Sequence, residues 1–464
     1  MKYLKKLFPV GISKNRSKNM KNSNKLEIHR NRKGQRILSK KEWLFVAVVG
    51  LAGQLIWCIE NTWYPNFVYA KIAPDASIIS WMVALSALAS TFGCFVWGTL
   101  GDRLGKRRPQ MLIGYAAWGI TVVLFGLTEY VDHSDLAKLT ALVVFADCVM
   151  SFIGAMANDS GFIAWTTDIT EEGNRGKMGA LVAVLPVAGT ILGGLLFGKI
   201  IEKIDYFKFF IVAGLFLILM SVGVHFMVKD APDLLPNRDP KGFWHQVFAV
   251  FDFSLLKNNK LMRDVCIIFA VYFIGFQMYF SHLTNFLIYT QGYSTGNAGL
   301  VLGLPLIAAL PFTFLCSRYL DNGKFYNIMY VSVAITIAGL LIVWIPNTIL
   351  TCMGIFLFGT GYMCIYQALM VMLKNCMPKS MHGQSEGIRQ LFYVVIPMCI
   401  GTPIGSYLIK HFGNPMHNEY GVAGYSANRI TFIAAALWMP LVLIPIAIAK
   451  KDYLKQQNTK DKNE

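Results

Sequence analysis

Long apolar stretches alternate with short polar segments along most of the chain. Twelve of these stretches reach about 20 residues, the length that a helix needs to cross the hydrocarbon core of a membrane. Backbone groups in lipid must be bonded within their own segment, so each stretch is predicted to be a helix. The predicted spans are 43–69, 77–100, 110–129, 139–163, 177–200, 207–228, 264–290, 298–317, 325–345, 349–373, 384–409 and 430–449.

The longest polar segment between spans divides the helices into two sets of six. It covers residues 229–263 and carries three prolines, followed by an aromatic-rich stretch at 243–251 that is typical of an amphipathic helix at the membrane surface. We therefore predict an all-α membrane protein of two six-helix bundles. Its predicted parts are a basic, disordered tail at 1–42, bundles at 43–228 and 264–449, the central loop at 229–263, and a second tail at 450–464.

The distribution of positive charge predicts the orientation of the helices. The chain has 464 residues, is 55% hydrophobic and carries a net charge of +17. If both termini are cytoplasmic, 35 of the 43 lysines and arginines lie on the cytoplasmic side and only seven lie outside, as the positive-inside rule requires. The excess charge is thus explained by membrane orientation rather than by nucleic acid. We predict a multi-pass protein of the cell membrane with both termini inside.

The remaining composition argues against catalysis. The nine cysteines show no CxxC spacing and fall mostly inside apolar runs, so they are interpreted as small buried hydrophobes. The sequence contains no nucleotide-binding loop, metal-ligand cluster or catalytic triad pattern. We expect a monomer that is not an enzyme and uses no cofactor or metal.

The polar segment 98–108 is the most specific motif. It joins the second and third spans with three glycines, one aspartate and four cations within a single short loop. It is similar to the loop between helices 2 and 3 of major facilitator superfamily transporters. The resemblance implies two bundles around a central cavity, alternating access, and an inner gate in which Asp102 accepts hydrogen bonds at the start of the eleventh span. The expected gate residues are Gly98, Asp102, Arg103, Gly105, Lys106, Arg107, Asp159, Asp168 and Arg175.

A second motif gives a narrower resemblance. Residues 158–170, followed by Arg175-Gly176, are similar to the end of helix 4 in the glycoside–pentoside–hexuronide cation symporters, the melibiose permease group. That resemblance implies sugar transport and acidic residues in the first and fourth spans. The sodium site of the group uses acidic residues of helix 2, however, and the second span here has no Asp or Glu.

Polar residues inside the first bundle are candidates for binding. Carboxylates within a membrane span are costly, which makes them functional candidates. Gln54, Trp57 and Asn61 share one helical face with Glu60 at its edge, a combination suited to sugar stacking and hydroxyl binding. Asp147 in the fourth span is a candidate for substrate or proton binding. The alternatives are a structural pair for Glu60 and an interfacial position for Asp147.

The second bundle offers a polar stripe and an aromatic group. Gln277, Ser281 and Asn285 recur at every fourth residue and are expected to face the cavity. His282 lies beside them and is a candidate proton carrier, or else a structural hydrogen-bonding group. Further candidates lie in the tenth and eleventh spans, where Arg389 could bind an anion or extend toward the inner surface. These candidates are Tyr362, Tyr366, Arg389 and Tyr393.

These observations favour a secondary active transporter. The first hypothesis is symport of a small polar solute, a sugar or glycoside, with a cation. Glu60, Asp147 and His282 are the candidates for binding the coupling ion, a proton or sodium. The second hypothesis is an exporter of amphipathic compounds with the same fold, and the third is a membrane sensor without transport. The expected partners are thus the solute, the coupling cation and the lipid bilayer.

Overall fold

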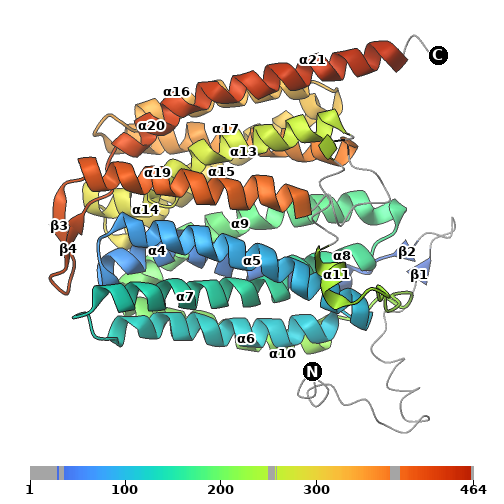
Figure 1. The fold of residues 1–464 in the computed structure, drawn as a ribbon, viewed down its shortest axis with the longest axis horizontal. Helices are drawn as coiled ribbons and strands as arrows, with labels where there is room; N and C mark the ends of the chain where they lie inside the picture. Colours follow the sequence, from blue (N-terminus) through green and yellow to red (C-terminus); the bar gives the residue numbers. More distant parts are fainter. Residues whose placement is uncertain (1–28, 31–35, 249–255, 258, 377–386, 461–464) are drawn as a thin grey trace, which may run out of the picture.

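The computed structural model describes residues 29–30, 36–248, 256–257, 259–376 and 387–460, and most of the predicted tail 1–42 lies outside this part. Long helices run side by side, with the N-terminal half on one side and the C-terminal half on the other (Figure 1). The hairpin β3–β4 lies at one end of the helices and α11 at the other. We call these the outer and inner ends, following the predicted orientation.

Six spans form each half. In the N-terminal half they are span 1 (α3 Lys40–Cys58, η1 Ile59–Trp63, α4 Tyr64–Phe67, η2 Val68–Ile72), span 2 (α5 Ala76–Leu104), span 3 (α6 Arg108–Gly126, η3 Leu127–Tyr130), span 4 (α7 Leu136–Gly154, η4 Ala155–Phe162, α8 Ile163–Asp168), span 5 (α9 Glu172–Ile204) and span 6 (α10 Tyr206–Met227).

The C-terminal half repeats this plan after the short helix α11 (Phe243–Phe248). Its members are span 7 (α13 Lys260–Phe280, α14 Leu283–Asn285, η6 Phe286–Thr290), span 8 (α15 Thr295–Asp321), span 9 (α16 Phe325–Ile342), span 10 (α17 Thr348–Cys376), span 11 (residues 387–412, with η7 Leu391–Val395 and α19 Ile396–Phe412) and span 12 (α20 Ile430–Trp438, η8 Met439–Val442, α21 Leu443–Lys460). Two short antiparallel pairs complete the fold: β1 (His29–Arg30) with β2 (Arg36–Ile37), and β3 (Pro415–His417) with β4 (Ala423–Tyr425).

The predicted all-α fold is confirmed, because twelve helices in the described residues are long and apolar enough to span a membrane. Several begin before the apolar run that predicted them, since polar side chains cap their first turn. Span 1 starts at Lys40, where Ser39 and Glu42 form a capping box. Asp75 caps span 2 by accepting a hydrogen bond from the backbone N–H of Ser77.

Four of the described spans contain π-helical turns, and three of these turns hold candidate residues. Those three cover Ile59–Trp63 in span 1, Ala155–Phe162 in span 4 and Leu391–Val395 in span 11, and two further π turns end spans 1 and 7 at Val68–Ile72 and Phe286–Thr290. Wider π turns are rare and frequently occur at functional sites, because they reorient side chains and loosen the regular backbone ladder. Hydropathy does not predict these turns, yet the first three hold the candidate residues Glu60, Asp159 and Tyr393.

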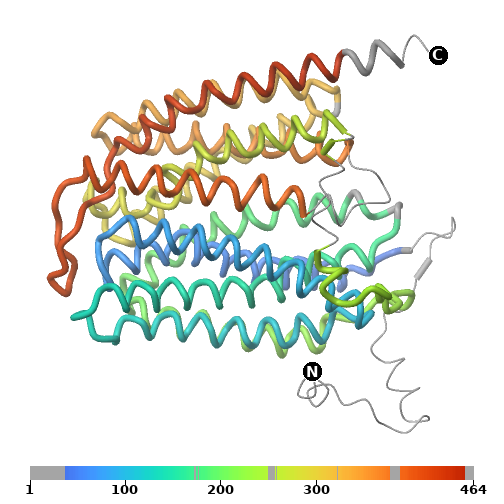
Figure 2. The backbone as a smooth tube through the Cα atoms, in the orientation of Figure 1, coloured from blue at the N-terminus to red at the C-terminus, as the bar shows by residue number. Residues whose placement is uncertain are grey.

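The two halves contact each other at the outer end. Figure 2 traces the backbone there, where the hairpin between spans 11 and 12 lies beside the N-terminal half. Span 5 packs on span 8 and span 2 packs on span 11. Glycines allow spans 5 and 8 to pack closely, since a Cβ added at Gly299 would lie 2.1 Å from the carbonyl oxygen of Gly194. Hydrogen bonds between the halves also lie toward the outer end, among them Ser80 to Ser406 at 2.8 Å, Asn66 to Asn285 at 2.9 Å and the Gly296 N–H to Glu202 at 3.0 Å.

We expect Gly299→Ala to destabilise the protein by about 1–3 kcal/mol, because the methyl group would separate two closely packed backbones. Thermal unfolding in detergent measures the effect. Gly98→Ala is the matched control, since its Cβ would meet only Ser160 Cβ at 3.9 Å and alanine favours a helix. Equal unfolding temperatures for the two variants would contradict the close crossing.

Candidate functional site

Two membrane carboxyls, Glu60 of span 1 and Asp147 of span 4, form the centre of the site. Glu60 Oε1 accepts a 2.7 Å hydrogen bond from the hydroxyl of Ser151, one turn along span 4 from Asp147. Ser86 of span 2 lies close to both carboxyls, and its hydroxyl donates to the Val83 carbonyl at 3.4 Å. Asp147 is only 2% exposed and Glu60 is half-buried. The structure thus brings together the two acids that the sequence singled out separately.

The chemistry of this pair follows from its surroundings. Two ionised carboxylates close together in a low-dielectric environment repel each other and are poorly solvated. Ser86 and Ser151 can donate hydrogen bonds but carry no positive charge. A bound proton or a small cation therefore stabilises the pair more than double ionisation does. Ser86 was missed from the sequence because nothing local to it marks a hydroxyl in an apolar span.

The other polar residues of span 1 contribute differently. Asn61 donates a 2.8 Å hydrogen bond to the backbone oxygen of Trp57, so its amide supports its own helix. The Trp57 ring packs 5.0 Å from that of Trp118, and Gln54 lies against Gly189 of span 5. Trp57 and Gln54 remain half-buried and keep their predicted position near Glu60.

Asp159 lies close to this pair and interacts with a base of the other half. Its carboxylate accepts hydrogen bonds from Asn158 at 3.0 Å and from Cys94 at 3.9 Å, and it interacts electrostatically with Arg389 of span 11. The prediction paired Asp159 with Arg175 or another base. Arg175 is exposed near the start of α9, so among the described residues Arg389 is the base that Asp159 meets.

The C-terminal half supplies an aromatic cluster. Tyr393 lies 5.2 Å from Tyr366 and 4.6 Å from Phe273, and the guanidinium of Arg389 lies 5.6 Å from the Tyr393 ring. Tyr362 stacks on Phe276 at 4.8 Å and on Tyr366 at 6.1 Å. The tyrosines were predicted; the phenylalanines of span 7 were not, although their spacing of three places them on one helical face.

The predicted polar stripe of span 7 is buried and contributes to the joint between the halves. Ser281 donates to Gln277 at 3.2 Å. Asn285 donates to the Pro65 carbonyl at 3.1 Å and accepts from Asn66 at 2.9 Å, both on span 1. His282 is 1% exposed and its Nε2 lies 3.1 Å from Ser406 Oγ. Asn285 thus faces the N-terminal half, and span 1 occupies its amide in this structure.

The 98–108 loop fastens spans of the N-terminal half to one another. Arg107 is 5% exposed and pairs with Asp102 at 2.5 Å and with Asp168 at 2.8 Å. Burial lowers the pKa of Arg107, but the Asp168 and Asp102 carboxylates outweigh that effect and raise it above its ordinary value. Asp230 caps span 3 by accepting from the backbone N–H groups of Arg107 and Arg108.

The predicted partner of Asp102, the start of the eleventh span at 384, lies outside the described residues. Among the residues that the structure describes, the Asp102 carboxylate pairs with Arg107 on the same loop. Arg103 contacts Gln246 of α11, and Lys106 is exposed. Gly105 adopts a positive φ of 59° at the end of α5, which favours glycine, whereas Gly98 has room for a side chain.

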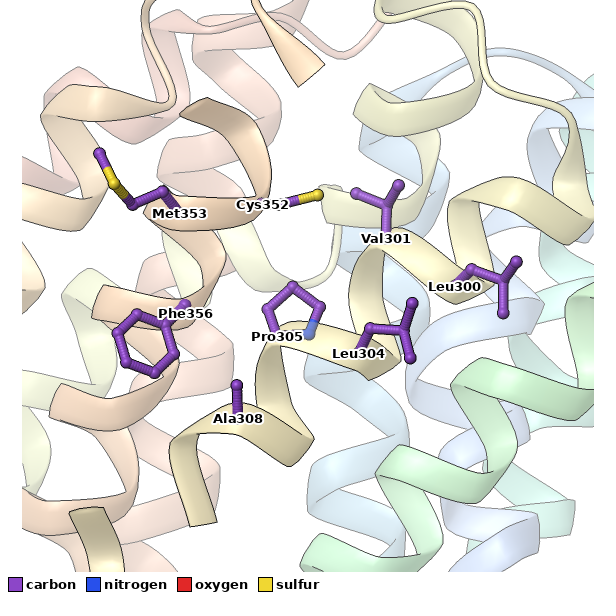
Figure 3. Close-up of a pocket in the computed structure, with 8 residues that line it drawn as sticks. All are labelled: Leu300, Val301, Leu304, Pro305, Ala308, Cys352, Met353 and Phe356. Carbon is purple, nitrogen blue, oxygen red and sulfur yellow. The ribbon is translucent and has the colours of Figure 1, made fainter. Parts of the chain in front are cut away.

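An apolar pocket of about 380 Å³ lies apart from these residues, between α15 and α17. Figure 3 shows Leu304, Pro305 and Phe356 around it. Leu304 is 55% exposed, so the pocket opens on the surface that would face lipid. Its lining suits apolar groups and does not extend the polar site.

Twelve spans in two halves, with carboxyls held at mid-membrane, define a membrane transporter. The chain matches the Major Facilitator Superfamily over residues 45–402 and belongs to that family. The narrower melibiose permease group is not singled out by this match.

Sequence relatives include two bacterial efflux proteins. The multidrug efflux pump LfrA of Mycolicibacterium smegmatis is 29% identical over 223 residues, which are 47% of this chain and 40% of LfrA. The multi-drug resistance efflux pump PmrA of Streptococcus pneumoniae is 23% identical, over 71% of this chain and 79% of PmrA. The match to LfrA thus spans less than half of that relative.

Solved structures share the fold at low identity. The nucleoside transporter NupG has a TM-score of 0.69 at 11% identity, covering 88% of this chain and 100% of NupG. A D-xylose-proton symporter has a TM-score of 0.64 at 13% identity, covering 88% of this chain and 97% of the symporter. At these identities the likeness concerns the fold alone.

Proposed function

We propose that this protein is a secondary active symporter that moves a sugar or glycoside together with a proton or another small cation. The observation that carries the proposal is the Glu60–Asp147 pair inside the predicted spans, where Ser151 donates to Glu60 and Ser86 lies close to both acids. If the two carboxyls bind one cation more tightly in one conformation of the surrounding helices than in another, cation binding shifts the protein toward that conformation.

The solute class follows from the groups around that pair. Trp57 and the tyrosines of the C-terminal half offer ring faces, while Asp159 and Arg389 offer hydrogen-bonding groups from opposite halves. A sugar presents both an apolar ring face and hydroxyl groups, so it uses both kinds of contact. The resemblance of residues 158–170 to the glycoside–pentoside–hexuronide symporters supports the same class.

Export of amphipathic compounds is the second candidate. The relatives LfrA and PmrA are named as efflux pumps, and the cluster around Tyr362, Tyr366 and Phe276 would suit an aromatic compound. The acid pair serves either direction, since an exporter exchanges its solute for the same cation.

Transport assays with purified protein in liposomes separate the two candidates. We expect an inward proton or sodium gradient to accumulate one member of a panel of labelled sugars and glycosides. Protein-free liposomes and an ionophore that collapses the gradient are the controls. The proposal is overturned if no sugar accumulates under either gradient while a fluorescent amphipathic amine is extruded.

A further inference from the structure

The hairpin β3–β4 connects spans 11 and 12 at the outer end but is fastened to the other half of the molecule. The backbone N–H of Tyr425 donates to the Pro74 carbonyl at 2.9 Å, and the Asn418 amide donates to the Ile72 carbonyl at 3.2 Å. Gly424 lies against Pro74 so closely that a Cβ there would be 2.1 Å from its oxygen. The hairpin therefore crosses from the C-terminal half onto the junction of spans 1 and 2.

A buried lysine holds the tip of this hairpin. The Lys71 side chain is 8% exposed, and its Nζ lies 2.8 Å from Glu419, 3.1 Å from Asp205 and 3.4 Å from Glu129. Glu419 makes the shortest of these ion pairs and is the member that belongs to the C-terminal half. The other two partners belong to the N-terminal half, Glu129 in span 3 and Asp205 at the junction of spans 5 and 6, so Lys71 remains paired when Glu419 leaves.

Tyr420 adds a second contact beside the ion pairs. Its ring stacks 4.4 Å from that of His133, and its hydroxyl donates to Glu129 at 3.2 Å. Burial and the neighbouring Glu129 carboxylate raise the pKa of Tyr420, which keeps this hydroxyl protonated as a donor. His133 also contacts the Lys71 backbone oxygen at 2.8 Å, which fixes the ring that Tyr420 covers.

Hydrogen bonds within the hairpin hold its own shape. The Asn418 side chain accepts from the backbone N–H groups of Tyr420 and Val422, and Gly421 takes a positive φ of 76° in the turn. At its base the Ser426 N–H donates to the Asn414 carbonyl at 2.9 Å. These bonds lie within the hairpin and do not depend on its contacts with the N-terminal half.

We propose that residues 414–426 form a strap that closes the outer end and undocks from Lys71, Ile72 and Pro74 whenever the halves separate there. The strap favours the state in which the outer end is closed. Because Glu419 is its charged contact, the strength of the Lys71–Glu419 pair sets how often the outer end opens. The Glu419 side chain is 63% exposed, so salt weakens the pair.

Hydrogen exchange in the full-length protein, measured residue by residue in nanodiscs, tests the strap. Exchange of the Tyr425 amide reports undocking, while exchange of the Ser426 amide reports unfolding of the hairpin itself. We expect Glu419→Gln to accelerate Tyr425 exchange by about twofold to fivefold, as for an ion pair with one exposed partner, without changing Ser426. High salt is expected to accelerate Tyr425 exchange in the unmodified protein as well.

Asp132→Asn is the matched control, since the hydrogen bonds described for this outer carboxylate both run to the neighbouring Ser134. The proposal is overturned if Glu419→Gln leaves Tyr425 exchange unchanged or if Asp132→Asn accelerates it equally. A matching rise for the Ser426 amide would also overturn it, because the hairpin would then be unfolding in place rather than undocking.

Discussion

Glu60→Gln is expected to abolish gradient-driven accumulation of the solute while leaving exchange across the membrane. A glutamine retains the size of the side chain and can accept from Ser151, but it cannot carry the charge that makes the pair bind a cation. A potential of about 100 mV is worth about 2.3 kcal/mol for each charge moved, which corresponds to about fiftyfold accumulation. That accumulation is the quantity that the variant should lose.

Two assays separate coupling from binding. Accumulation under an imposed gradient measures coupling, and counterflow without a gradient measures solute binding and exchange. Asp147→Asn is expected to behave like Glu60→Gln, and the double variant should be no worse than either, because the two carboxyls act as one unit. Glu42→Gln is the matched control, since glutamine still completes the capping box of span 1. If Glu60→Gln accumulates solute as the unmodified protein does, Glu60 has no part in coupling.

The topology could be predicted from the sequence because lipid permits few solutions. Apolar length predicts each span, and the spans so predicted differ from the structure mainly at their ends, where residues such as Ser39 and Asp75 extend the helices. The acids Glu60 and Asp147 were also predictable, since a carboxyl in an apolar span is conspicuous.

The contacts among site residues could not be predicted in the same way. The depth of Asp159 in span 4 predicts a place near the inner side, but it does not identify Arg389 as the base that this carboxylate meets. Helical spacing predicts the polar face that holds Asn285, but not its hydrogen bonds to span 1 of the other half. Single-helix periodicity contains no information on π turns or on how the halves meet.

The contacts of the strap could not be predicted from the sequence either. Residues 414–426 lie between the eleventh and twelfth predicted spans, and their pattern is neither apolar nor strongly charged. Lys71 lies between the first two predicted spans, yet it is buried and pairs with carboxylates from three distant segments. Neither role has a local signal in the sequence.

Arg107→Gln is expected to destabilise the N-terminal half by about 3–5 kcal/mol, the cost of removing one partner from a buried ion pair. Arg107 reaches Asp102 at the end of span 2 and Asp168 at the end of span 4. Without the guanidinium, the largely buried Asp168 carboxylate loses its counter-charge. Thermal unfolding in detergent, followed through tryptophan fluorescence, measures the loss.

Lys106→Gln is the matched control, because it removes a charge from the same loop at an exposed position. The loss of stability in Arg107→Lys should lie between those of Arg107→Gln and Lys106→Gln, since a single ammonium cannot bridge both carboxylates as the planar guanidinium does. Asp168→Asn in the Arg107→Gln background should recover part of the stability by removing the unpaired charge. Equal stability of the Arg107→Gln and Lys106→Gln proteins would mean that the motif contributes charge for orientation alone, and that spans 2 and 4 are held by packing.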